Sequence, residues 1–475
     1  MSDVRRLVLP FVACVALLVR VVPLLSRGGL LFWGRYDDGV YYAASASLLA
    51  GRVPYRDFVL LHPPLIMLVL APFALLGRLT SDPVGLLAAR LTWMLLGTGL
   101  AVLAARYAAR WGTLAGLAAG LWVACSSGAS YASQTTFIEP AADTALFGAV
   151  VLLTCDRVRP RHELVAGVLL GMALTGKIWY VAPVGALLLA LLVSRRASAL
   201  RAGAAACVTA AAILLPFFVL APRDMWHMVV YDQIGRPTNG RTGLLDRLGT
   251  AVGGRGLGLG HPDTHIVTFV ATAALLVAVV ACLRDRQARL VAAVAIGAVG
   301  VLMFSPIVFH HYGAFPAAGV GATMGIGWSL VGPTLLRPVV LRRAAAWVAI
   351  AAVAGCGVLV LRHPLGLPFP RREVDARLPA GCITSDDPTT LILANRLSSD
   401  LRAHCDVAVD VTGASYGVRI GRGKNLAFQD WLTSYLRSGS AMILARRTHD
   451  RMRIDTVPSL GTMTFSRGIV HVIRP

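Results

Sequence analysis

The sequence predicts an all-α polytopic membrane protein that ends in a small α/β domain, and three observations predict this class. Hydrophobic residues make up 56% of the 475 residues and charged residues only 15%, where soluble domains average about 45–50% and about 25%. The apolar residues gather in runs of membrane-spanning length, and the basic residues cluster between those runs. A water-soluble globule of this composition could not cover its surface with polar groups.

Apolar runs of roughly 20 residues can cross a bilayer core of about 30 Å as helices. We expect about eleven spans, near residues 7–25, 84–106, 112–129, 141–154, 163–177, 179–193, 202–220, 264–283, 289–306, 312–331 and 344–361. The first has a basic start but no small-residue cleavage site directly after it, so we interpret it as an uncleaved helix. The segment 63–78 is apolar but short and bounded by prolines, which favours a helix lying in the membrane interface.

Basic residues set the expected orientation. The chain has 45 Lys+Arg and 24 Asp+Glu, a formal net charge of +21. Arginines fill alternate loops, near 5–6, 106–110, 157–161, 195–201, 284–289 and 337–343, and the turns 130–139 and 307–311 between them contain no Lys or Arg. This is the positive-inside pattern, and it needs no nucleic-acid partner. We expect a multi-pass protein of the cell membrane with a cytoplasmic N-terminus.

That orientation places three long segments outside the cytoplasm. They are a first loop at 26–83, a second loop at 221–263, and everything after residue 362. We therefore expect two domains, a transmembrane domain over 1–362 and an extracytoplasmic domain over 363–475.

The composition of residues 363–475 predicts a small α/β domain. Residues 391–401 have helical spacing, and 407–411, 441–445 and 469–473 alternate or are continuously apolar, as in strands. Cys382 and Cys405 are the only cysteines there, and an oxidising compartment favours a disulfide over two free thiols. A zinc site is not expected, because no second close pair of ligands accompanies them.

Two adjacent carboxylates in the first outside loop are the first candidates for chemistry. The loop reads Tyr36-Asp37-Asp38-Gly39 directly after a predicted span, where carboxylates are costly unless they are satisfied. One could act as a general base on a hydroxyl, and the pair permits a divalent cation, Mg²⁺ or Mn²⁺, without requiring one. The alternative is a solvated Asp-Asp-Gly turn, which the local sequence alone favours.

The order of motifs along residues 1–330 favours a catalytic role for the two aspartates over a solvated turn. Asp37-Asp38 is followed by His62-Pro63-Pro64, then by the Gly-rich segment 167–177 that ends in Lys177, and then by the segment 309–316 with its two histidines, tyrosine and proline. In order and spacing this resembles the membrane-embedded GT-C glycosyltransferases, in particular the branch of the protein O-mannosyltransferases and aminoarabinose transferases.

The resemblance implies transfer of a sugar from a polyprenyl-phosphate donor to a glycan, glycolipid or protein acceptor at the outer face of the membrane, with inversion. It implies Asp37 as the base that deprotonates the acceptor, and Asp38 as a residue that positions the acceptor or a cation. The two assignments can be exchanged. Membrane lipid is the surrounding partner.

The leaving phosphate needs cationic donors. Lys177 is one of only two lysines in the chain and is expected at the outer end of a span, with snorkelling as the alternative. Arg56, His310 and His311 are further candidates for phosphate contact, with solvation or helix capping as alternatives.

Four residues are candidates for sugar or acceptor binding: Glu139, Asp143, His62 and Tyr36. The resemblance implies one acidic residue near the start of the span at 141–154, and both Glu139 and Asp143 satisfy this. Favourable charge at a helix N-terminus is the alternative for Glu139.

Two other functions share the predicted topology. A flippase for lipid-linked sugars would show internal repeats and charged residues at the membrane midplane, and neither is evident. A non-catalytic envelope-assembly subunit would not need the two aspartates, so their substitution separates it from an enzyme.

Overall fold

A computed structural model describes residues 2–26, 29–33, 36–155, 157–236, 242–335, 338–362, 366–416, 420–445 and 460–475. Arg337 of the last predicted cytoplasmic loop and residue 363, where the predicted soluble domain begins, lie outside these ranges. The chain forms two compact units. Unit 1 comprises Met1–Pro23, Thr92–Ile213 and Gly240–Pro364, and unit 2 comprises Leu24–Leu91, Leu214–Asn239 and Leu365–Pro475.

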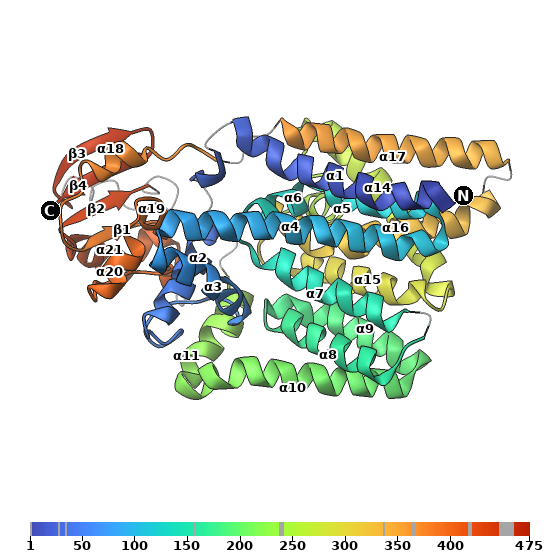
Figure 1. The fold of residues 1–475 in the computed structure, drawn as a ribbon, viewed down its shortest axis with the longest axis horizontal. Coiled ribbons are helices and arrows are strands. Elements are labelled where there is room, and N and C mark those ends of the chain that lie inside the picture. The colour runs from blue at the N-terminus through green and yellow to red at the C-terminus, as the bar shows by residue number, and fades with distance from the viewer. Residues whose placement is uncertain are drawn as a thin grey trace. The chain divides into compact units, whose positions relative to one another are not determined.

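Unit 1 is helical (Figure 1). Its helices, three of which continue into unit 2, are α1 (Ser2–Ser26), α4 (Asp82–Ala108), α5 (Thr113–Cys125), α6 (Ser127–Gln134), α7 (Ile138–Leu153), α8 (Pro160–Leu174), α9 (Val181–Ser194), α10 (Arg196–Leu220), α13 (Leu244–Ala251), α14 (His261–Arg284), α15 (Ala288–Phe304), α16 (Ala314–Leu335) and α17 (Val339–Leu361). Helix α5 packs against α16, α7 against α8, and α9 against α15.

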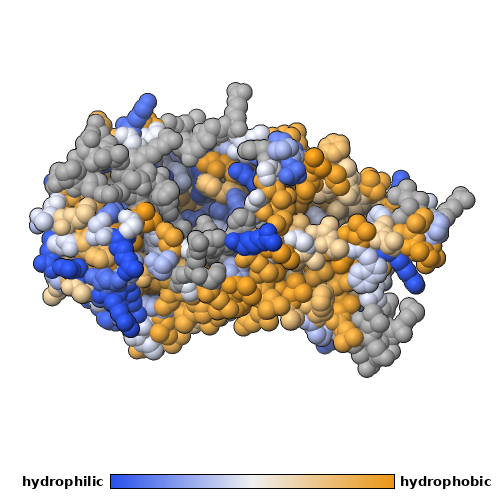
Figure 2. Space-filling model, turned by 90° about the horizontal axis from the view of Figure 1, so that it is seen from above, coloured by the Kyte–Doolittle hydropathy of each residue, from blue (hydrophilic) through white to orange (hydrophobic). Residues whose placement is uncertain are grey.

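The predicted spans all overlap helices. Among the described residues, six helices are long and apolar enough to cross a membrane, and the bent pair α5–α6, with an angle of 56°, makes a seventh. The other predicted spans overlap α7, α8, α9 and α15, which are shorter. Figure 2 shows an extended hydrophobic surface on the helical part of the molecule. Exposed apolar side chains such as Phe304, at 90% exposure, and Phe269, at 70%, fit a lipid-facing surface.

Unit 2 joins the first predicted outside loop to the C-terminal residues. Helices α2 (Tyr36–Leu49) and α3 (Leu65–Leu79) pack together, and α2 also packs against α19 (Pro388–Leu393). Gly39 makes the second contact possible, because a Cβ at this position would lie 2.5 Å from the backbone nitrogen of Thr389. The same unit contains the short helices α11 (Pro222–Trp226), η4 (His227–Tyr231) and α12 (Asp232–Ile234).

The C-terminal residues form a four-stranded sheet in the order β1-β2-β4-β3. Strand β1 (Ile383–Ser385) is parallel to β2 (Ala441–Leu444), while β4 (Val470–Arg474) is antiparallel to β2 and to β3 (Thr462–Arg467). Helices α18 (Arg371–Asp375), α19, α20 (Leu397–Arg402) and α21 (Leu426–Arg437) accompany the sheet. Asn425 caps α21 by accepting a hydrogen bond from the Phe428 backbone N–H, and α21 supplies much of the core.

The predicted strands at 441–445 and 469–473 are confirmed as β2 and β4. The helical spacing at 391–401 corresponds to two short helices, α19 and α20, which are separated by a break at Asn395 with a positive φ of 53°. The predicted strand at 407–411 is wrong. Val407, Val409 and Val411 are buried, but their segment pairs with no strand among the residues that the structure describes. Val411 instead packs into the core with Phe428 and Leu432, so burial without pairing produced the strand-like pattern.

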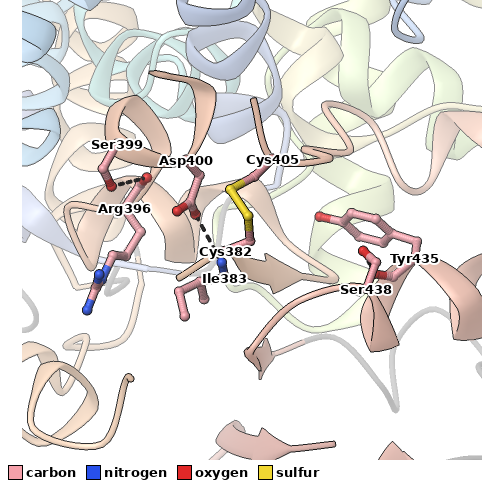
Figure 3. The surroundings of a disulfide bond; sticks show 8 residues. All are labelled: Cys382, Ile383, Arg396, Ser399, Asp400, Cys405, Tyr435 and Ser438. Carbon is pink, nitrogen blue, oxygen red and sulfur yellow. Dashed lines mark hydrogen bonds between the residues drawn. A yellow bond between two sulfur atoms is a disulfide. The ribbon is translucent and has the colours of Figure 1, made fainter. Parts of the chain in front are cut away.

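Cys382 and Cys405 form a disulfide with a Cα–Cα distance of 5.6 Å (Figure 3). The bond joins the residue before β1 to a residue just after α20. The Asp400 carboxylate lies beside it and accepts a hydrogen bond from the Ile383 backbone N–H at 3.4 Å. The disulfide and this hydrogen bond both fix α20 against β1.

Candidate active site

The two predicted aspartates lie in the first turn of α2, where negative charge is favourable, but their surroundings differ. Asp38 is fully buried and ion-paired with Arg90 of α4. Arg90 donates from Nε to Asp38 Oδ2 at 2.9 Å, and its Nη2 donates to the same oxygen. Its Nη1 donates to the Leu30 carbonyl at 2.8 Å, and the guanidinium lies 4.1 Å from the Phe32 ring centroid. The charge of Asp38 is therefore balanced inside unit 2.

Asp37 is only partly buried, and its neighbour Tyr36 is anchored by the C-terminal residues. The Tyr36 hydroxyl donates to Asp410 Oδ1 at 2.9 Å and accepts from the Thr412 backbone N–H at 2.7 Å. Asp410 also accepts from the Gly413 N–H at 2.7 Å. Burial raises the pKa of Asp410, and these two hydrogen bonds oppose the rise. This network fixes the helix start that carries Asp37.

Two arginines, Arg236 and Arg422, lie near Tyr416 of the C-terminal residues. The Arg236 guanidinium lies 5.1 Å from the centroid of the Tyr416 ring, and Arg422 donates from Nε to Ser415 Oγ at 2.9 Å. The Tyr416 hydroxyl interacts electrostatically with both arginines and with Asp37. Asp410 acts on the same hydroxyl, so unit 2 brings two carboxylates and two cations around one tyrosine. This arrangement could not be predicted from the sequence, because no short motif links residues so far apart.

The loop between α2 and α3 holds Arg56 and His62. Tyr55 has a positive φ of 70°, an uncommon conformation for a non-glycine residue, and its hydroxyl donates to the His62 carbonyl at 2.9 Å. Arg56 is exposed and ion-paired with Asp57 at 2.8 Å, and this hydrogen bond lowers the pKa of Asp57 to about 2. His62 is buried, with its ring centroid 5.8 Å from that of Tyr41.

In unit 1, the predicted acids near the start of α7 each have a partner just after α8. Lys177 Nζ donates to Glu139 Oε1 at 2.9 Å, and both side chains are nearly buried. The same Nζ lies 3.9 Å from the Trp179 ring centroid. The Tyr180 hydroxyl donates to Asp143 Oδ1 at 2.6 Å. The loop after α8 is thus connected to α7 by two buried polar contacts.

His310 and His311 begin the short helix η5 (His310–Gly313) and lie among aromatic rings. The Tyr131 ring is 5.5 Å from His310 and 5.9 Å from His311, centroid to centroid. Gly256 has a positive φ of 85° and lies so close to the His310 ring that a Cβ there would overlap it. The glycine-rich segment therefore allows the close approach of His310.

The residues do not fit a divalent-cation site at the aspartate pair. Asp38 is neutralised by a guanidinium, and a cation would have to compete with that charge. Across the described part of the chain, no three His, Cys, Asp or Glu side chains converge as ligands. No cofactor is supported by this donor set.

A sequence model of glycosyltransferase family 87 matches residues 60–306, just over half of the chain. The chain belongs to this family. It is a glycosyltransferase, which decides against a flippase or a non-catalytic assembly subunit. No curated protein sequence gives a match to the chain.

Solved structures show the same fold and confirm the predicted GT-C resemblance. ArnT from Cupriavidus metallidurans, bound to undecaprenyl phosphate, has a TM-score of 0.63 at 18% identity and covers 98% of this chain and 97% of its own. The oligosaccharyltransferase AglB from Archaeoglobus fulgidus, in complex with an inhibitory peptide and a dolichol-phosphate, has a TM-score of 0.57 at 11% identity over 93% of this chain and 69% of its own. A second AglB structure, in complex with Zn and sulfate, has a TM-score of 0.57 at 12% identity over 95% of this chain and 69% of its own. The multi-pass membrane architecture of the chain follows from this fold and from its apolar helices.

Proposed function

We propose that the chain transfers a sugar from a polyprenyl-phosphate donor to an acceptor hydroxyl at the outer face of the membrane, with inversion. The undecaprenyl phosphate in the ArnT structure and the dolichol-phosphate in the AglB structure support this class of donor. In the proposed orientation the N-terminus is cytoplasmic, and the domain that follows residue 362 lies outside. The acceptor is a glycan, glycolipid or protein of the cell envelope.

The ion pair of Asp38 with Arg90 carries the assignment of the base. A carboxylate whose charge is balanced by a buried guanidinium is a poor proton acceptor, so we assign the base to Asp37 and a supporting role to Asp38. Asp37 takes the proton of the acceptor hydroxyl while that oxygen bonds to the anomeric carbon. The bond from this carbon to the phosphate oxygen breaks, and polyprenyl phosphate leaves with the electron pair.

We propose phosphate contacts by Lys177, His310 and His311, with Arg56 as the candidate from the first loop. The Tyr312 ring centroid lies 4.3 Å from Lys177 Nζ and 4.6 Å from the His311 ring, so these residues share one aromatic cluster in unit 1. Binding of a phosphate would take over the role of Glu139 as counter-charge.

Glu139, Asp143 and His62 remain proposals for sugar or acceptor contact. Tyr36 is buried and its hydroxyl is bound to Asp410 and Thr412, so we propose that it positions α2 in place of the sugar or acceptor contact expected from the sequence. The buried contacts of Glu139 with Lys177 and of Asp143 with Tyr180 also give these two acids a structural role.

The decisive experiment compares wild type, Asp37→Asn and Asp38→Asn in detergent, with a panel of labelled polyprenyl-phosphate sugars and a membrane lipid extract. General-base catalysis is worth about 10²–10⁴-fold, so Asp37→Asn should lose at least the lower figure without a change in thermal stability. Asp38→Asn should lose activity together with stability, because it leaves Arg90 buried without its partner. Full activity in Asp37→Asn would refute the assignment.

The same transfer assay tests whether turnover requires a divalent cation. Since Asp38 is neutralised by Arg90, we propose that turnover needs no divalent ion. Activity should persist in excess EDTA, and its loss with recovery on added Mg²⁺ or Mn²⁺ would contradict the proposal.

A further inference from the structure

Unit 2 contains a cavity that belongs to neither group of candidate catalytic residues. Its volume is about 200 Å³. The end of α2, the last turns of α3 and residues 398–404 line it. Leu49, Ala74 and Leu401 supply apolar surface, and Arg78, Arg402 and His404 supply polar surface. These three polar residues are all exposed, so a ligand has access from outside.

The cavity has an excess of positive charge. Arg78 donates from Nη1 to the Leu49 carbonyl at 3.0 Å, and Arg402 donates from Nη1 to the Arg78 carbonyl at 3.4 Å. Each guanidinium has five N–H donors, and a bond to a neutral backbone carbonyl does not balance its charge. The described carboxylate that acts on Arg402 is Asp82, which also accepts a hydrogen bond from the Ser398 N–H at 2.9 Å. Arg78, Arg402 and His404 line the cavity together, and no carboxylate is among its described lining residues.

Helix α3 provides the second observation. Leu75 is 43% exposed, Leu76 37% and Leu79 74%, in the same two turns as Arg78. An apolar helix face with a cation at its end is typical of a helix lying at the membrane interface. Exposed leucines beside a cationic cavity match the two halves of a lipid, its chains and its anionic headgroup.

We propose that this cavity binds the phosphate of an anionic membrane lipid. Arg78 and Arg402 pair with the phosphate, His404 adds a hydrogen bond, and the acyl chains lie along the exposed leucines of α3. Ordinary ligand pockets measure about 300–1,000 Å³, so a cavity of about 200 Å³ suits a headgroup and not a whole lipid. The site is independent of the proposed function, because it includes none of the residues assigned to transfer.

The experiment measures lipid binding by the purified full chain in detergent, by native mass spectrometry with phosphatidylglycerol or phosphatidylcholine. Wild type should retain phosphatidylglycerol in preference to phosphatidylcholine. The double variant Arg78→Gln/Arg402→Gln should lose about 10- to 30-fold in phosphatidylglycerol affinity. The charge-preserving variant Arg78→Lys/Arg402→Lys should lose less, because the point charges remain while the bidentate geometry is lost.

The matched control removes two arginines elsewhere in unit 2. Arg372 and Arg377 are exposed, and Arg372→Gln/Arg377→Gln should stay within about twofold of wild type. An equal loss in this control would show a general charge effect and overturn the site. Displacement of the lipid by millimolar inorganic phosphate would show a free-phosphate site and overturn the lipid assignment.

Sugar transfer from a short-chain, detergent-soluble donor separates this proposal from the proposed function. Arg78→Gln/Arg402→Gln should keep that transfer while it loses phosphatidylglycerol. If the variant loses both sugar transfer and phosphatidylglycerol binding, the two arginines belong to the catalytic machinery and the separate lipid site is refuted.

Discussion

Arg90 and Asp38 form the ion pair on which the active-site assignment depends, and both side chains are fully buried. Breaking such a pair from one side typically costs about 3–5 kcal/mol, because an uncompensated charge remains inside. Arg90→Gln should therefore lower the thermal stability of the detergent-purified protein strongly. Arg90→Gln/Asp38→Asn should recover part of the loss, since neither charge is left. A single variant as stable as wild type would contradict the burial of the pair.

Tyr36 is a positioning residue, because it holds the start of α2 through Asp410 and Thr412. Tyr36→Phe keeps the ring but leaves Asp410 short of one donor, at a cost of about 1–3 kcal/mol. We expect kcat to fall about tenfold with KM little changed, since Asp37 loses its orientation. Tyr435→Phe is the matched control, because the Tyr435 hydroxyl accepts from the Ser385 N–H at 3.3 Å within the sheet core. It should lose stability but keep kcat, and an equal fall in kcat would refute the positioning role.

Asp400 should make the stability of unit 2 depend on pH. Burial raises its pKa from 3.8 to about 7. Because the folded state then binds more protons than the unfolded state between about pH 4 and pH 7, stability is greatest at the acid end of this window and is lost as pH rises. Thermal unfolding from pH 5 to pH 8 should show this decline in wild type and a weaker one in Asp400→Asn. The exposed Asp430 provides the control Asp430→Asn, which should behave as wild type.

At the residue scale, local motifs predicted the candidate site residues. Their hydrogen-bond and ion-pair partners could not be predicted, because those partners lie far away in the sequence. The Asp-Asp-Gly turn and the scarce Lys177 are visible in the sequence. Tyr36 and Asp410 lie 374 residues apart, and no spacing rule connects them. Arg90 does carry information in the sequence. An arginine inside an apolar run is costly unless it has a partner, so its position predicts a buried counter-charge.

At the scale of elements, the contact of α2 with α19 depends on Gly39. An alanine Cβ there would lie 2.5 Å from the Thr389 backbone nitrogen, and backbone cannot rotate away as a side chain can. Gly39→Ala should destabilise the protein by about 1–3 kcal/mol and reduce activity, because α2 carries Asp37. Thermal unfolding measures the first effect and the transfer assay the second.

Gly99 of α4 is the control for this substitution. A Cβ at Gly99 would meet nothing within 4 Å, so Gly99→Ala should be neutral or stabilising by up to about 1 kcal/mol. If the two variants behave alike, helix propensity and not the contact with α19 explains the effect at Gly39.

Elements were predicted well where apolar periodicity decides them and poorly where pairing decides them. Each predicted span overlaps a helix, because a long apolar run in a membrane has few alternatives to a helix. The segment 407–411 is apolar but lies outside the described sheet. Strand β3 pairs with β4 but is largely exposed, so its sequence has no apolar pattern that predicts a strand. Strand formation depends on a partner that the local pattern does not contain.

For the whole molecule, the arginine clusters predict the topology. Alkaline phosphatase fused after Pro475 should be active, because the C-terminal residues are proposed to lie outside the cytoplasm, where the enzyme folds with its disulfides. The same enzyme inserted in the arginine-rich loop at 157–161 should be inactive, because positive loops stay inside.

Substitution of Arg157, Arg159 and Arg161 by Gln tests the cause of this topology. The first arginines and four other cationic loops still favour the original orientation, so the C-terminal fusion should stay active. Since one disulfide of the C-terminal residues also needs an oxidising compartment, Cys382 and Cys405 should resist alkylation unless the protein is first reduced. An inactive C-terminal fusion together with freely alkylated cysteines would reverse the proposed orientation, and with it the placement of Asp37 at the outer face.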